Sequence, residues 1–101
     1  MMKYIITENR LDEFLTNYLN SWVKDMAVSH TNPFIIISRK IEDFEDWDDY
    51  MEYDYSDGRL WINKNFKNLM MDMSNKSEVG VRVFIGKWFE DKFNVDIKYV
   101  E

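Results

Sequence analysis

The chain has 101 residues, a hydrophobic fraction of 46%, an aromatic fraction of 17% and a formal net charge of −6. This length favours a single domain over residues 1–101, and the aromatic content excludes a disordered chain, because such side chains supply apolar surface that offsets the entropy of ordering. The absence of cysteine excludes disulfides, thiolate zinc sites and cysteine nucleophiles. We find no signal peptide and no window of ~20 apolar residues, and therefore expect a soluble, cytoplasmic protein without a membrane partner.

The first part of the chain predicts a short strand and then a helix. Residues 3–6 are β-prone and stop at Thr7, which suits a helix N-cap. Apolar side chains then recur at helical spacing for more than four turns, which predicts an amphipathic helix over residues 8–27. Its apolar stripe consists of Leu11, Phe14, Leu15, Tyr18, Leu19, Trp22, Val23 and Met26.

A turn and a buried strand are expected next. Residues 29–33 combine Pro33 with four turn-forming or polar residues, which predicts a turn. The uninterrupted apolar run of residues 34–37 predicts a strand that is buried on both faces and central in a sheet.

Residues 42–57 hold nine of the 19 acidic residues, five aromatic residues and none of the 13 basic ones. The rest of the chain therefore carries a balance of +3, so the acidity is local and creates a field that attracts basic partners and repels nucleic acid. The spacing of Ile41, Phe44 and Trp47 predicts one or two helical turns at its start.

A β-hairpin over about residues 50–63 is predicted by the Asp57-Gly58 pair, since a two-residue type I′ turn requires positive φ at both positions. That turn would place Tyr55 opposite Leu60 and Asp54 opposite Trp61. One face of the hairpin would then be apolar, with Met51, Tyr53, Tyr55, Leu60 and Ile62. The other would carry Glu52, Asp54 and Trp61.

The remaining elements are two helices and a strand. Asn63 or Asn65 can cap a helix whose buried stripe is Phe66, Leu69, Met70 and Met73. Residues 79–93 fit a strand or a helix, and we choose the helix because its apolar set is larger and the pattern ends at Asn94. Alternation over residues 95–99 predicts a closing strand. The whole pattern predicts an α+β domain, with a mixed or antiparallel sheet packed by helices on one face.

No constellation for catalysis stands out, so we expect no enzyme, no cofactor and no metal site. His30 is the only histidine and lies in the predicted turn. Aligning an EF-hand loop on Gly58 would put Tyr53 and Tyr55 at ligand positions, which excludes that motif. There is no glycine-rich phosphate loop, and the scattered basic residues disfavour direct nucleic-acid binding.

The opening residues, Met-Lys-Tyr-Ile-Ile-Thr-Glu and the helix after them, together with frequent Lys, Asn, Asp and Ile, resemble the start of short tailed-phage proteins. The resemblance covers about 20 residues and carries over no site residue. It implies a virion component or an inhibitor of host machinery, located in the virion or the host cytoplasm.

Three functions are compared on this basis. The leading hypothesis is a non-enzymatic protein-binding domain, with possible self-association, whose acidic and aromatic face meets a basic protein surface. The second is an acidic mimic of nucleic acid that inhibits a nucleic-acid-binding enzyme, and the third is a small carboxylate- or metal-dependent hydrolase. The predicted partner-binding residues are Asp46, Asp48, Asp49, Glu52, Asp54 and Trp61.

Overall fold

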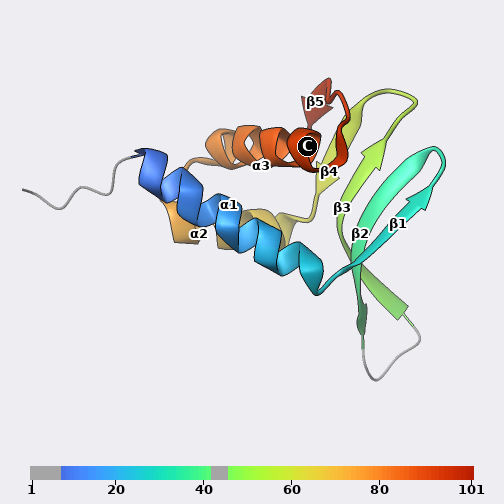
Figure 1. Ribbon diagram of the computed structural model, residues 1–101, viewed down its shortest axis with the longest axis horizontal. Helices are drawn as coiled ribbons and strands as arrows, with labels where there is room; N and C mark the ends of the chain where they lie inside the picture. The colour runs from blue at the N-terminus through green and yellow to red at the C-terminus, as the bar shows by residue number, and fades with distance from the viewer. Residues whose placement is uncertain (1–7, 42–45) are drawn as a thin grey trace, which may run out of the picture.

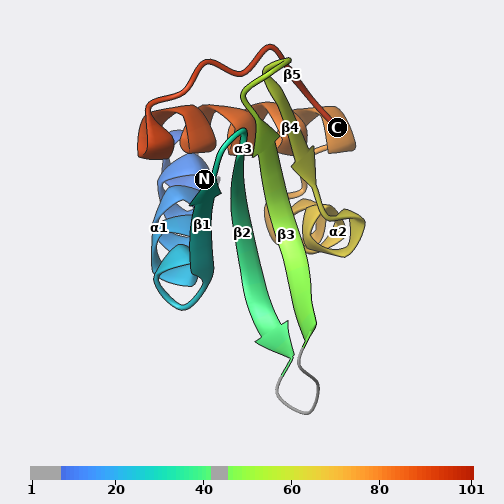
Figure 2. The same ribbon diagram turned by 90° about the vertical axis from the view of Figure 1, so that its right-hand side faces the viewer.

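The computed structural model describes residues 8–41 and 46–101. Within them, three helices pack on one face of a five-stranded mixed sheet of order β1-β2-β3-β4-β5, which confirms the predicted α+β class (Figure 1). Turned by 90°, the sheet lies in front and all three helices lie behind it (Figure 2). The elements are α1 (Glu8–Lys24), β1 (Ala27–Thr31), β2 (Phe34–Ile41), β3 (Asp46–Asp54), β4 (Arg59–Ile62), α2 (Lys64–Ser74), α3 (Glu78–Phe93) and β5 (Tyr99–Val100).

The inner face of the sheet, which the helices cover, is built from two cross-strand rows. Successive side chains of a strand point to opposite faces, so the register assigns each residue to a face. Nearly all members of these rows are apolar, and Ile35, Ile37, Met51, Leu60 and Ile62 are almost completely buried. The rows are Val28, Ile37, Met51 and Ile62, and then His30, Ile35, Tyr53, Leu60 and Val100.

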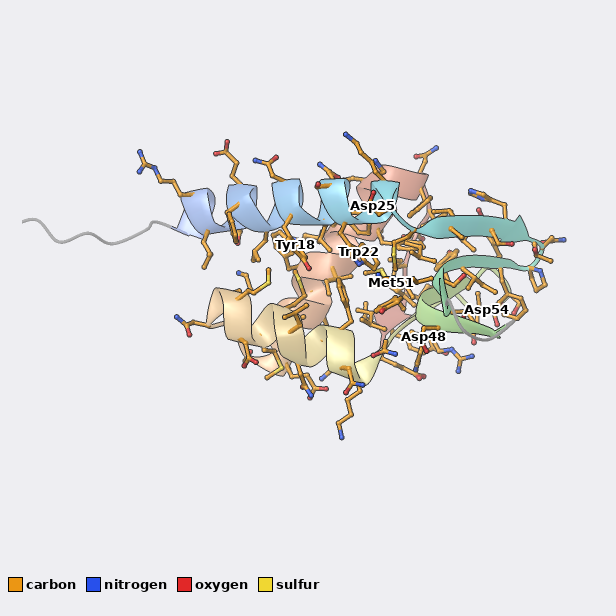
Figure 3. All side chains as sticks on the ribbon, turned by 90° about the horizontal axis from the view of Figure 1, so that it is seen from below. Tyr18, Trp22, Asp25, Asp48, Met51 and Asp54 are labelled. Carbon is orange, nitrogen blue, oxygen red and sulfur yellow. The ribbon has the colours of Figure 1, made fainter. Side chains whose placement is uncertain are left out.

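The first helix follows the predicted stripe as far as Val23, but it ends at Lys24 and not at residue 27, where β1 begins. Leu15, Leu19 and Val23 are buried, and Trp22 stacks on Phe66 of α2 with ring centroids 4.6 Å apart. Tyr18, Trp22 and Met51 point into the interior between α1, α2 and the sheet (Figure 3). The prediction was wrong for Phe14, which is mostly exposed because it lies at the border of the stripe. None of the described helices is long and apolar enough to span a membrane.

The prediction of a turn over residues 29–33 was wrong for residues 29–31, which belong to strand β1. The turn itself has two residues, 32 and 33. Residues 27–31 pair with β2 in full antiparallel register, and only Asn32 and Pro33 connect the two strands. Because β2 gains a neighbour on this side, it is central as predicted. Its burial is one-sided, however: Ile35 and Ile37 are fully buried, whereas Ile36 on the uncovered face is half-buried.

The start of the acidic segment is extended and not helical. Ile41 ends β2 and Trp47 lies in β3, so the prediction of helical turns was wrong where the structure describes them. Pairing of eight residues of β2 with β3 outweighs the local helical spacing. A bulge leaves Tyr50 unpaired between Met51 and Asp49. The Tyr50 ring packs edge-on against Trp22, with ring centroids 5.7 Å apart. Phe44, the predicted strand over residues 3–6 and the cap at Thr7 lie outside the described residues.

The β3–β4 hairpin is confirmed, but its loop has four residues, 55–58, instead of two. Asp54 therefore pairs with Arg59, and Glu52, in place of Asp54, lies opposite Trp61. The Asp54 carboxylate accepts a hydrogen bond from Ser56 N at 2.9 Å, which favours the wider turn. The register of the hairpin differs from the prediction by two residues, so each strand residue still lies on its predicted face. Tyr55, predicted to be buried in the strand, is mostly exposed in the loop.

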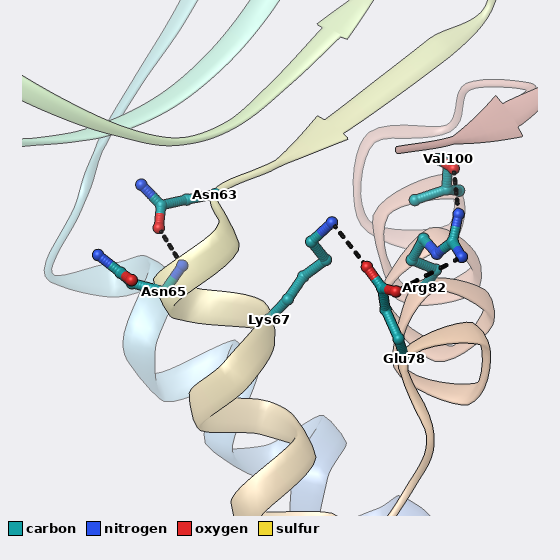
Figure 4. Close-up of polar contacts among 6 residues, drawn as sticks. All are labelled: Asn63, Asn65, Lys67, Glu78, Arg82 and Val100. Carbon is teal, nitrogen blue, oxygen red and sulfur yellow. Dashed lines mark hydrogen bonds and ion pairs between the residues drawn. The ribbon is translucent and has the colours of Figure 1, made fainter.

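Both later helices begin at a capping side chain, and for α2 the structure selects Asn63 from the predicted pair Asn63 and Asn65. Asn63 Oδ1 accepts from Asn65 N at 2.8 Å (Figure 4). Ser77 Oγ accepts from Gly80 N at 3.1 Å. Helix α3 ends at Asn94, which adopts the left-handed conformation typical of a C-cap. The helical alternative for this segment is therefore confirmed. In α2, Phe66 and Met70 are buried and Met73 is half-buried, whereas Leu69, predicted to be buried, is largely exposed.

The closing strand is shorter than predicted. Only Tyr99 and Val100 form β5, which runs parallel to β4 at the end of the sheet. Ile97 N donates to the Glu90 carboxylate at 2.8 Å, which ties the preceding segment to α3 and keeps it out of the sheet. The chain then joins β4 through Lys98 N, which donates to Gly58 O at 2.7 Å.

Candidate protein-binding face

The outer face of the sheet, which no described helix covers, carries a mixed set of polar and apolar side chains (Figure 2). The hydroxyl oxygens of Ser29 and Thr31 lie 2.8 Å apart, which confirms that alternate residues of β1 share this face. Its polar groups remain accessible to solvent or a partner. The cross-strand rows are Ser29, Ile36, Glu52 and Trp61, and then Thr31, Phe34, Asp54, Arg59 and Tyr99.

A shallow hollow of about 270 Å³ lies on the outer face around Trp61. Three carboxylates and one guanidinium line it with the indole, so the side chains at the hollow are predominantly negative. The guanidinium is engaged, since Arg59 Nη1 lies 3.5 Å from the Glu101 carboxylate. We call this feature the Trp61 hollow; its lining residues are Asp49, Glu52, Arg59, Trp61 and Glu101.

The position of Trp61 follows from strand alternation. Its neighbours Leu60 and Ile62 are fully buried on the inner face, so the indole must point outward. It is half-buried there and lies opposite Glu52 in the ladder. A large aromatic side chain beside carboxylates, on a face that no helix of residues 8–41 or 46–101 covers, has the chemistry of an interface anchor.

Asp54 and Arg59 form the charged part of the adjacent row. Hydrogen bonds from the side chain and backbone of Ser56 lower the pKa of Asp54, and Arg59 acts in the same direction. The neighbouring Asp57 and Glu101 carboxylates raise the pKa of Arg59. Both groups therefore keep their charges at neutral pH.

The predicted acidic residues separate into groups. Asp49, Glu52 and Asp54 share the outer face with Trp61, whereas alternation places exposed Asp48 on the other side of β3. Asp46 lies in β3 opposite Ile41, and its side chain is outside the description. The structure thus brings three of the five predicted carboxylates to one face.

Sequence reasoning missed Arg59 and Glu101 as parts of this site. Arg59 could have been recognised, because it alternates with Leu60 and so shares a face with Trp61. Glu101 had no such signal. It reaches the hollow because Glu101 N donates to Leu60 O at 2.8 Å and Ile62 N donates to Glu101 O at 3.2 Å, a parallel pairing that local sequence does not encode.

Other chemistry is sparse in the part of the chain that the structure describes. There, no group of three or more His, Asp or Glu side chains is arranged to hold a metal ion. His30 is exposed on β1, and the centroid of its ring lies 6.1 Å from that of Phe93. Searches against family models, curated proteins and solved structures found no match. The interpretation of the site therefore depends on its own geometry.

Proposed function

We propose that the protein is a non-enzymatic binding module whose outer sheet face holds a basic surface of a protein partner. One observation carries the proposal: half-buried Trp61 lies in a hollow with three carboxylates, on a sheet face that none of the described helices covers. Aromatic side chains at the centre of a polar rim are typical of residues that dominate binding energy.

The Trp61 hollow has the chemistry to receive an Arg or Lys side chain. A cation above the indole gains about 0.5–2 kcal/mol from the ring quadrupole, depending on how far it is desolvated. Asp49 and Glu52 can accept hydrogen bonds from the same group, and charge-assisted bonds are stronger than neutral ones. Arg59 already holds Glu101, so the two remaining carboxylates determine the preference for a cation.

The biological context in this proposal is a phage accessory or virion-associated protein. It rests on the resemblance of the first 20 residues to tailed-phage proteins, and it places the partner in a virion or in the host cytoplasm.

The experiment is affinity capture from cells of the native host, followed by titration of the captured partner in a calorimeter. We expect the double variant Asp49→Lys/Glu52→Lys to weaken binding at least tenfold. The matched control Glu13→Lys/Asp72→Lys makes the same charge change at exposed helical positions and should bind like the parent chain. Equal binding by both double variants would overturn the proposal.

A nucleic-acid mimic is the competing function, and the same face argues against it. A mimic needs an uninterrupted series of carboxylates, whereas Arg59 and Trp61 lie among the acids of this face. Competition with duplex DNA for the captured partner separates the two functions. Displacement of DNA that fades between about 50 and 200 mM salt, the range over which phosphate contacts weaken, would favour the mimic.

A further inference from the structure

A second surface lies on the opposite side of α3 from the core, between that helix and the C-terminal segment. Figure 1 shows this segment and β5 running beside α3, and the groove between them has a volume of about 450 Å³. Its floor is mainly apolar, with charged side chains at its rim. We call it the α3 groove; it is lined by Val79, Arg82, Val83, Gly86, Lys87, Glu90, Ile97, Lys98, Tyr99 and Val100.

The floor of the α3 groove exposes apolar side chains that the folded chain does not use. Val79 and Val83 are 61% and 52% exposed, and they are two of the seven large apolar residues that are exposed in the described chain. The Tyr99 hydroxyl, in contrast, donates to Asp57 Oδ2 at 3.2 Å. Valine in an exposed helical position loses rotamer freedom without gaining burial. Helix α3 is thus apolar on two sides, since its inner side already buries Val81, Ile85, Trp88 and Phe89.

The rim of the groove is basic, in contrast to the outer face of the sheet. Lys87 and Lys98 form no ion pair with any described residue. The single acid, Glu90, is engaged by Ile97 N at 2.8 Å. The local field therefore favours negative charge within a chain whose net charge is −6.

Arg82 adds a guanidinium with weak contacts. Its Nη2 lies 4.0 Å from Glu78 and its Nη1 donates to Val100 O at 3.5 Å, both long distances (Figure 4). Its Nε is buried and has no hydrogen-bond partner. A buried donor without a partner costs free energy, so a carboxylate that engages this guanidinium, after a rotation that frees Nε, would relieve that cost.

We propose that the α3 groove is a docking site for an acidic segment of another protein. A bulky apolar side chain of the segment packs on Val79 and Val83, and flanking Asp or Glu residues meet Lys87, Lys98 and Arg82. Nucleic acid fits less well, because it needs several stacking rings or a long basic track, and Tyr99 is the only ring in the groove. The protein then carries two docking surfaces of opposite charge.

The test is a selection of random dodecapeptides displayed on phage against the immobilised chain, followed by fluorescence anisotropy of the enriched peptides. We expect one class with bulky apolar residues flanked by Asp or Glu. Its affinity should fall at least tenfold with Val83→Ser and with Lys87→Glu, both at exposed positions. Leu69→Ser and Lys64→Glu, exposed on α2, are the matched controls and should leave the affinity unchanged.

The same selection also reports on the outer sheet face. Basic peptides that depend on Glu52 and Trp61 would support the proposed function, whatever happens at the α3 groove. The groove proposal fails if no acidic class is enriched, if Val83→Ser and Lys87→Glu bind the acidic class as tightly as the controls do, or if labelled duplex DNA binds the groove instead. Thermal unfolding of each variant verifies that a lost signal reflects the surface and not the fold.

Discussion

The two faces of the sheet share the same five strands but differ in what they present. The inner face is mostly apolar, and its residues on β2, β3 and β4, such as Ile35, Met51 and Leu60, are buried under three helices. The outer face mixes hydroxyl, carboxylate, guanidinium and aromatic groups. Stability is therefore concentrated on the inner face. The outer face is free to carry side chains that the fold does not need, and this makes Trp61 informative.

The largest effect is expected from removing apolar volume on the inner face. Ile37→Ala should lower the free energy of unfolding by about 2–5 kcal/mol, because the side chain is completely buried and truncation leaves a cavity. Ile36→Ala on the adjacent, half-buried position of the outer face should cost less than half as much. Urea denaturation measures both. Equal costs would contradict the division of stability between the faces.

The next prediction concerns the loop of residues 55–58, which sets the register between β3 and β4. Gly58→Ala should lower the free energy of unfolding by at least about 1 kcal/mol, since φ is +72° and the new Cβ would lie 2.6 Å from Lys98 Cγ.

The matched control for the loop is Gly80→Ala. This glycine is inside α3 with no positive φ, its new Cβ would meet only side-chain atoms at 3.3 Å or more, and alanine is the better helix former. We expect an unchanged or slightly higher melting temperature. A larger loss at Gly80 than at Gly58 would contradict the described loop geometry.

The helix layer behind the inner face depends on its caps. Asn63→Ala should lower the free energy of unfolding by about 1 kcal/mol, because it removes the acceptor for Asn65 N and Phe66 N and the donor to Asp49 O. Asn65→Ala is the control, because Asn65 supplies only its backbone to this cap. Chemical denaturation should therefore give a lower free energy of unfolding for Asn63→Ala than for Asn65→Ala. Equal free energies would argue against Asn63 as the cap.

The smallest change in stability is expected from Asp54, on the outer face, at acid pH. The pKa of Asp54 is lowered in the folded chain, so its contribution to stability is present above the unfolded pKa, about 4. The contribution is lost as the pH falls through the lower folded pKa. Asp54→Asn should flatten the stability profile below pH 4 in thermal unfolding scans. A profile identical to that of the parent chain would contradict the role of the Ser56 hydrogen bonds.

Sequence patterns predicted the helices and the division of the hairpin into two faces, because these depend on local periodicity. The stripe of α1 except Phe14, the choice of helix for residues 79–93 and a cap at Asn63 or Asn65 all follow from spacing along the chain. Even the wrong loop length preserved the faces, since a shift of two residues leaves alternation unchanged.

Pairing between strands explains the errors. Nothing local in residues 27–31 or 46–49 indicates a strand, and both become extended because β2 lies between them. Glu101 lies at the hollow because it pairs in parallel with β4, about 40 residues earlier in the chain. Local periodicity carries no information about a pairing over this distance. The candidate face was therefore only partly predictable: alternation placed Glu52, Asp54 and Trp61 on one face of the hairpin, but the position of Glu101 beside them could not be predicted.

The most direct measurement compares Trp61→Ser in two assays, urea unfolding and titration of the captured basic partner. If Trp61 serves the partner and not the core, the free energy of unfolding should fall by less than the roughly 2–5 kcal/mol expected for a core truncation, while affinity for the partner falls at least tenfold. Leu60→Ala, on the inner face, should show the larger loss of stability. A core-sized loss of stability for Trp61→Ser, or unchanged partner affinity, would contradict the central claim.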